Sequence, residues 1–205
     1  MSRAVLMAAA LLLGLAVGPA SAVDPAAREA ALRQLKPPKG VGGCIFSAVP
    51  ADVRREAIVN LLAGKPGTPA ALQSAASEAA ERCVGRTSQP SDFALASSVT
   101  SAFRRSAAAF YLAHQFGIGQ EALETAWRAA PAEEKAPFYR VADDFFAPGL
   151  TVSDQALDAG GFARKAGLDI AATSVTEGFL RMYFINTAVS ERAEALLAAE
   201  ERRSP

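Results

Sequence analysis

Two arginines at equivalent places in two similar segments are the residues of this chain best suited to bind a ligand. At helical spacing, Ser98 shares a helix face with Arg105, and Ser174 shares one with Arg181. Two guanidinium groups with hydroxyls beside them can bind a carboxylate or a phosphate through paired hydrogen bonds. These four residues are the predicted ligand-binding site, and its ligand would be a small apolar or anionic molecule.

A purely structural role for the arginines competes with this interpretation. Glu177 precedes Arg181 by four residues, which is the favourable order for an ion pair within one helix. The side of the first helix that carries Arg105 lies opposite an apolar stripe containing Phe103 and Phe110, so we expect that side to face away from the core. Both roles stay open at this point.

Residues suited to catalysis or metal binding are few. His114 is the only histidine, and no serine lies in a sequence motif typical of a catalytic nucleophile. The pairs Glu133-Glu134 and Asp143-Asp144 could serve acid–base chemistry on a glycan, but neighbours on a helix point about 100° apart. We therefore predict no catalytic residue, no metal site and no cofactor. An enzyme that acts on cell-wall material through carboxylates stays as an alternative.

Residues 1–22 predict a signal peptide. Arg3 supplies a positive charge, and the apolar stretch around Leu11-Leu12-Leu13 is too short for a membrane span, which needs about 20 residues. Ala22 ends a small-x-small cleavage site. We expect cleavage near Ala22, residues 23–205 as a soluble chain in the periplasm or outside the cell, and no membrane-spanning helix after cleavage.

Export changes the interpretation of the two cysteines. Cys44 and Cys83 are the only cysteines, and neither lies in a redox or haem-attachment motif. In an oxidising compartment such a pair favours a disulfide bond. A bridge that closes a loop of about 40 residues would stabilise the fold by about 4 kcal/mol.

The composition and the positions of proline and glycine predict an all-α fold. Hydrophobic residues make up 51% of the chain, aromatic residues only 7%, and alanine, the strongest helix former, is the most frequent residue. Basic and acidic residues both number 21, and this balance argues against a nucleic-acid partner. Proline and glycine mark helix ends, and no alternating strand pattern occurs. We expect a single domain of seven or eight helices, at 24–35, 50–63, 68–84, 91–116, 120–129, 132–146, 153–166 and 169–199, with a Pro/Gly-rich loop at 36–43.

Two parts of the chain resemble each other and indicate an internal repeat. Segments 96–105 and 172–181 share six of ten residues, and both fall in the first half of a long predicted helix. Sparser matches extend the similarity to 50–116 and 131–199. A duplication would give two related three-helix units whose long helices pack against each other. Chance similarity is the alternative in a chain this rich in alanine and serine.

The function that these features favour is that of an exported, non-enzymatic helical binding protein of the cell envelope. It would act through helix surfaces on another envelope protein, and the polar last helix beyond Asn186 is either such a surface or a solvated end. The alternative is a carrier of a small molecule or a lipid, with an apolar cavity between the long helices. The oligomeric state stays unknown.

Overall fold

Eight helices make up the described part of the chain. The computed structural model describes residues 32, 35–65, 69–84, 92–147, 157–171 and 173–202. The helices are α2 (Val41–Ala48), α3 (Ala51–Leu62), α4 (Ala70–Cys83), α5 (Asp92–Phe116), α6 (Gln120–Ala129), α7 (Ala132–Phe146), α8 (Ala159–Lys165) and α9 (Ser174–Glu201). No strand occurs among these residues, and the predicted all-α class is confirmed.

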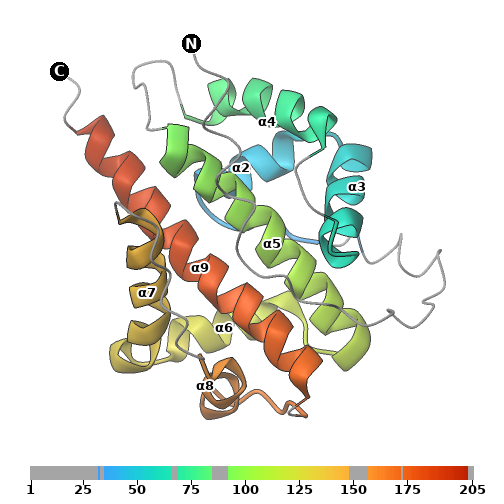
Figure 1. Ribbon diagram of the computed structural model, residues 1–205, viewed down its shortest axis with the longest axis vertical. Helices are drawn as coiled ribbons and strands as arrows, with labels where there is room; N and C mark the ends of the chain where they lie inside the picture. Colours follow the sequence, from blue (N-terminus) through green and yellow to red (C-terminus); the bar gives the residue numbers. More distant parts are fainter. Residues whose placement is uncertain are drawn as a thin grey trace.

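The two longest helices form the centre of the molecule. α5 and α9 run antiparallel and contact each other along much of their length (Figure 1). Ser98 near the start of α5 contacts Glu194 near the end of α9, and Tyr111 near the end of α5 stacks on Phe179 near the start of α9. The expected packing of the two long helices is therefore present.

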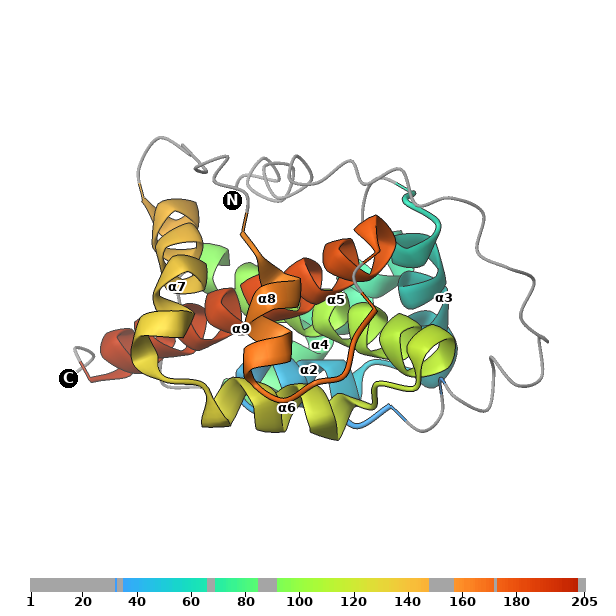
Figure 2. The same ribbon diagram turned by 90° about the horizontal axis from the view of Figure 1, so that it is seen from below.

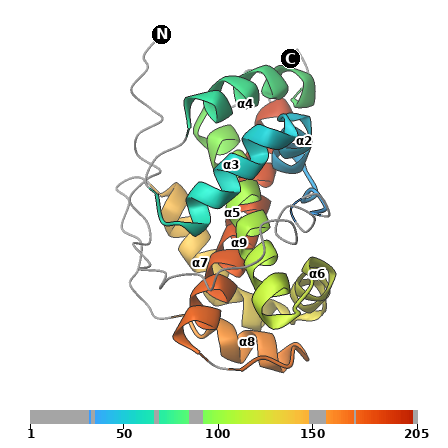
Figure 3. The same ribbon diagram turned by 90° about the vertical axis from the view of Figure 1, so that its right-hand side faces the viewer.

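The remaining helices divide between the two members of this pair. α2 and α3 pack on α5, and α4 packs on α2 and α3; Figure 3 shows these three helices gathered at one end of the molecule. α7 and α8 pack on α9, as Figure 2 shows, and α6 contacts α5. The central pair is consequently covered on several sides rather than on one.

Each group of helices has its own hydrophobic cluster. Phe46 of α2 meets Phe103 of α5 with ring centroids 4.8 Å apart, within a cluster that α3 and α4 complete. In the second cluster, Trp127 of α6 is the central ring, and its aromatic neighbours come from α7, α8 and α9: Phe138, Phe162 and Phe184, each with its ring centroid 5.7–5.9 Å from that of Trp127. Such ring pairs stabilise a core beyond the area that they bury.

A helix lies where the sequence predicted part of a loop. The expected loop at 36–43 overlaps α2, which begins at Val41. A Cβ atom on Gly42 would collide with the carbonyl oxygen of Ser98, and one on Gly43 would collide with that of Pro38. Gly42 therefore allows a close approach of α2 to α5, and Gly43 allows the backbone at Pro38 to lie against α2. These close contacts outweigh the loss in helix propensity, which is about 1 kcal/mol for each glycine relative to alanine.

Two helices near the C-terminus begin later than expected. α9 begins at Ser174 rather than at 169, because Thr173 caps it by accepting a hydrogen bond from the Thr176 N–H at 3.1 Å. α8 begins at Ala159 after its cap Asp158. Some of the predicted elements lie outside the described residues: the signal peptide 1–22, most of the helix 24–35, and residues 153–156 of the helix 153–166. The internal repeat stays a prediction.

Candidate functional site

Arg181, one of the two predicted binding arginines, is engaged in structural contacts. Its Nη2 donates a hydrogen bond to the carbonyl oxygen of Leu157 at 3.1 Å and lies 3.5 Å from Oε1 of Glu177. Glu177 in turn accepts hydrogen bonds from the backbone N–H groups of Ala159 and Gly160, at 2.7 and 2.6 Å. The carboxylate thus satisfies the open N–H groups at the start of α8, where the helix dipole favours negative charge.

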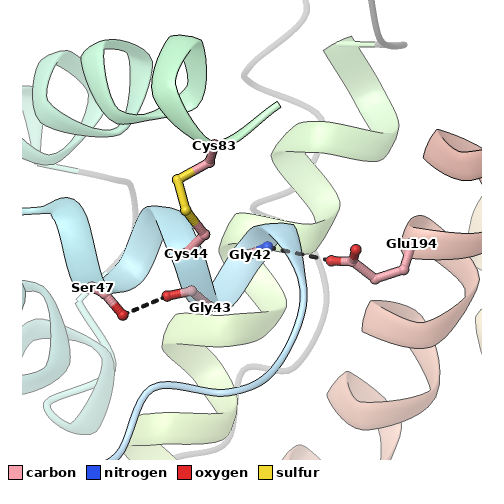
Figure 4. The surroundings of a disulfide bond; sticks show 6 residues. All are labelled: Gly42, Gly43, Cys44, Ser47, Cys83 and Glu194. Carbon is pink, nitrogen blue, oxygen red and sulfur yellow. Dashed lines mark hydrogen bonds between the residues drawn. A yellow bond between two sulfur atoms is a disulfide. The ribbon is translucent and has the colours of Figure 1, made fainter. Parts of the chain in front are cut away.

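The two predicted serines lie in different surroundings. Ser98 is fully buried (0% exposed), and its Oγ donates a hydrogen bond to Oε1 of Glu194 at 2.8 Å, whereas Ser174 is exposed at the start of α9. The same Glu194 oxygen accepts a hydrogen bond from the backbone N–H of Gly42 at 3.3 Å, and Figure 4 shows the carboxylate facing the first turn of α2. Ser98 therefore positions the carboxylate of Glu194.

The helix faces that carry these residues are more buried than the sequence suggested. Ser101 and Ala102, on the side of α5 expected to face away from the core, are 2% and 0% exposed. The reason is that α5 is covered by α9 as well as by α2 and α3, so its second side is buried too.

The predicted disulfide bond is present. Cys44 of α2 and Cys83 of α4 are joined with an S–S distance of 2.04 Å and a Cα–Cα distance of 5.8 Å (Figure 4). The bridge joins two helices. The disulfide and Glu194 hold α2 from two directions, toward α4 and toward α9.

The polar second half of α9 also faces other helices of the same chain. Glu191 accepts hydrogen bonds from Nε1 of Trp127 at 2.9 Å and from the hydroxyl of Tyr139. Nε of Arg192 lies 2.7 Å from Oδ1 of Asp143, and the guanidinium of Arg192 lies 4.9 Å from the Tyr139 ring centroid. These contacts connect α9 to α6 and α7.

Arg105 differs from Arg181 because it has no carboxylate partner among the described residues. Its guanidinium carbon lies 5.5 Å from the centroid of the Tyr183 ring of α9. Its Nε is buried, and no hydrogen-bond acceptor in the described part of the chain reaches it. The Tyr183 side chain, only 1% exposed, likewise has a buried hydroxyl without a hydrogen-bond partner there. Burial raises the pKa of Tyr183, and the positive charge of Arg105 opposes that shift.

Two polar side chains of α6 contact each other. Nε2 of Gln120 donates hydrogen bonds to the backbone oxygen of Lys36 at 3.0 Å and to Oε1 of Glu124 at 2.9 Å. Oε1 of Gln120 is buried without a partner in the described structure. The negative charge of Glu124 contributes to the raised pKa of Tyr183. We call Arg105 and Tyr183 the polar junction.

The other residues considered for chemistry are engaged in packing. His114 is half-buried and stacks on Phe110, with ring centroids 5.8 Å apart. Phe145 and Phe146 are also half-buried, and both pack on Phe93 at the start of α5. The described residues include no group of three His, Cys, Asp or Glu side chains arranged to hold a metal ion. None of the described helices combines the length and the apolar character that crossing a membrane requires.

Sequence reasoning therefore found Arg105, one member of the polar junction, and missed Tyr183. Tyr183 is two residues from Arg181 and lies off the helix face that carries Ser174 and Arg181. Its neighbours along α9 include several buried residues, among them Thr176, Leu180 and Phe184.

No protein-family model, no curated protein and no solved structure matches the chain.

Proposed function

We propose that this chain is an exported, non-enzymatic binding protein of the cell envelope. The observation that carries the proposal is the use of the carboxylates on α9. Glu177, Glu191 and Glu194 each accept two hydrogen bonds from other helices, and such contacts position helices rather than a substrate. Export rests on the predicted signal peptide at 1–22.

A protein of the envelope is the first candidate partner. Phe116 and Val175 are among the few large apolar side chains that are exposed, at 37% and 38%. They lie at the same end of the central pair, because Tyr111 packs against both Phe116 and Phe179, and Phe179 lies one helical turn from Val175. Exposed apolar side chains that lie close together favour protein contacts.

Site-specific cross-linking tests this partner. The full-length protein would carry a photo-reactive residue at Gln115, beside Phe116, and be irradiated in the periplasm of its host. We expect one cross-linked band that Phe116→Ser weakens severalfold. Leu196→Ser is the matched control, because Leu196 is exposed (42%) on the second half of α9, away from Phe116. Equal bands in both variants, or no band at all, would count against a protein partner at this surface.

A small anionic molecule is the second candidate ligand. The polar junction favours it, because a guanidinium without a carboxylate partner among the described residues is suited to binding an anion. The cell-wall-active enzyme has less support, since Asp143 is paired with Arg192 and Glu134 lies 3.7 Å from Lys165. Export itself is tested by sequencing the N-terminus of the purified protein, which should begin at Val23.

A further inference from the structure

Few contacts hold α4 against the rest of the described structure. Leu72 is its only large apolar side chain, and the other apolar residues of its inner face are mostly alanines: Ala75, Ala76, Ala79 and Ala80. Alanine buries little apolar area, so this face stabilises the packing of α4 only weakly. The helix packs mainly on α2 and α3, and no hydrogen bond or ion pair between described residues joins it to another helix.

In contrast, α2 is held in place by helices other than α4. Ile45 and Phe46 of α2 are 0% and 2% exposed, and the Phe46 ring packs on Phe103 of α5 at a centroid distance of 4.8 Å. The backbone N–H of Gly42 donates a hydrogen bond to Glu194 of α9. We therefore expect α2 to keep its position when α4 moves away.

The disulfide bond is the covalent connection between α2 and α4, and solvent can reach it. It joins Cys44 to Cys83, which is the last residue of α4 (Figure 4). Cys44 is exposed and Cys83 is half-buried, so a thiolate in solution can approach the sulfur of Cys44. Exposed disulfides exchange with thiols more readily than buried ones and are often regulatory.

We propose that the Cys44–Cys83 disulfide is a redox switch, and that its reduction by a dithiol releases α4 from the other helices. A thiolate of the reductant attacks Sγ of Cys44, the S–S bond breaks, and Cys83 leaves as a thiolate that takes up a proton. The second thiol of the reductant then attacks the mixed disulfide, which frees Cys44 as a thiol and leaves the reductant as a disulfide. This inference does not depend on the binding function proposed above.

Without the bridge, the helical state of α4 depends on its weak packing. The helix has 14 residues, and an isolated helix of this length is only marginally stable in water. Its release opens the hydrophobic cluster that it completes with α2 and α3, in which Ile45, Val49 and Ile58 are at most 2% exposed. Reduction therefore converts a closed surface into one with exposed apolar side chains.

Amide hydrogen exchange of the purified protein, measured by mass spectrometry before and after treatment with dithiothreitol, tests the switch. No denaturant is added, and dithiothreitol is the dithiol probe. We expect exchange in peptides from 70–83 to become about tenfold faster or more after reduction, and exchange in peptides from 99–112 of α5 to change less than about twofold. The native protein should be reduced at a rate within about tenfold of that of the urea-unfolded protein, because Cys44 is exposed.

A variant that carries both Cys44→Ser and Cys83→Ser is the matched control. Its α4 should exchange as fast as that of the reduced wild type, and dithiothreitol should not change this rate. Reoxidation of the wild type should restore slow exchange in α4, which shows that the release is reversible. If the double variant does not fold, the comparison of oxidised, reduced and reoxidised wild type still tests the proposal.

Three outcomes would overturn the proposal. The disulfide could resist dithiothreitol until the protein is unfolded, α4 could exchange equally slowly in the oxidised and reduced protein, or exchange could accelerate in α5 as much as in α4. In the first two cases the bridge is not a switch for α4, and in the third its reduction unfolds the whole protein.

Discussion

Replacing Glu194 by leucine tests whether one carboxylate holds α2 against the central helices. The carboxylate accepts hydrogen bonds from Ser98 Oγ at 2.8 Å and from the Gly42 N–H at 3.3 Å. Hydrogen bonds to a charged group contribute about 1.5–3 kcal/mol each, and the longer bond belongs at the low end of this range. Because the fully buried Ser98 hydroxyl would lose its acceptor, we expect Glu194→Leu to lower the free energy of unfolding by about 3 kcal/mol.

Urea denaturation of the oxidised protein at neutral pH measures this loss. Glu194→Gln keeps the shape and an acceptor oxygen, and should cost only about 1 kcal/mol for the lost charge at the start of α2. Glu201, exposed at the end of the same helix, supplies the control: Glu201→Gln should change stability by less than about 0.5 kcal/mol.

A double-mutant cycle identifies the interaction itself. Ser98→Ala removes the donor, so the loss in the double variant with Glu194→Leu should be smaller than the sum of the single losses by about 1 kcal/mol or more. Our reasoning is refuted if the two losses simply add, or if Glu194→Leu costs no more than the Glu201 control.

Three further perturbations have expected outcomes. Replacing Cys44 and Cys83 by alanine removes a bridge between residues 39 positions apart and should cost about 4 kcal/mol of unfolding free energy in urea titrations; a loss below about 1 kcal/mol would mean that α2 is held mainly by Glu194. Burial, reinforced by its hydrogen bond to Glu191, raises the pKa of Tyr139 to about 12, so the folded state favours the neutral phenol and this stability is lost as pH rises from about 10 through 12. Melting temperatures should therefore fall less steeply over this alkaline range for Tyr139→Phe than for wild type, and parallel curves would contradict this assignment. Tyr183→Phe should stabilise the ligand-free protein by about 1 kcal/mol, since it removes a buried hydroxyl without a partner among the described residues; a destabilised variant would show that the hydroxyl is hydrogen-bonded.

The helices set by local signals could be predicted from the sequence. The bounds of α6 and α7 agree with the prediction, because proline and glycine act on the backbone within one turn. The disulfide was predicted from the presence of only two cysteines in a chain with a predicted export signal. Local chemistry is readable because its cause and its effect are close together in the chain.

The contacts that hold the helices together could not be predicted in the same way. Gly42 and Gly43 indicated a loop, and their role became clear only with Ser98 and Pro38 beside them. Glu194 contacts Gly42 across 152 residues, and no single-chain pattern encodes which donor a distant carboxylate will meet. The partners of Ser98 and of the arginines are likewise set by packing, so the sequence alone does not specify them.

The two arginines illustrate how one difference between similar segments gives equivalent side chains different surroundings. When segments 96–105 and 172–181 are aligned, Glu177, four residues before Arg181, corresponds to Ser101, four residues before Arg105. Arg181 consequently has an ion-pair partner on its own helix, whereas Ser101 is buried (2% exposed) and brings no charge to Arg105. A carboxylate at this spacing neutralises a guanidinium, and a serine leaves the charge available to a group from elsewhere. The residue at position 101 is therefore the sequence difference that gives Arg105 surroundings unlike those of Arg181.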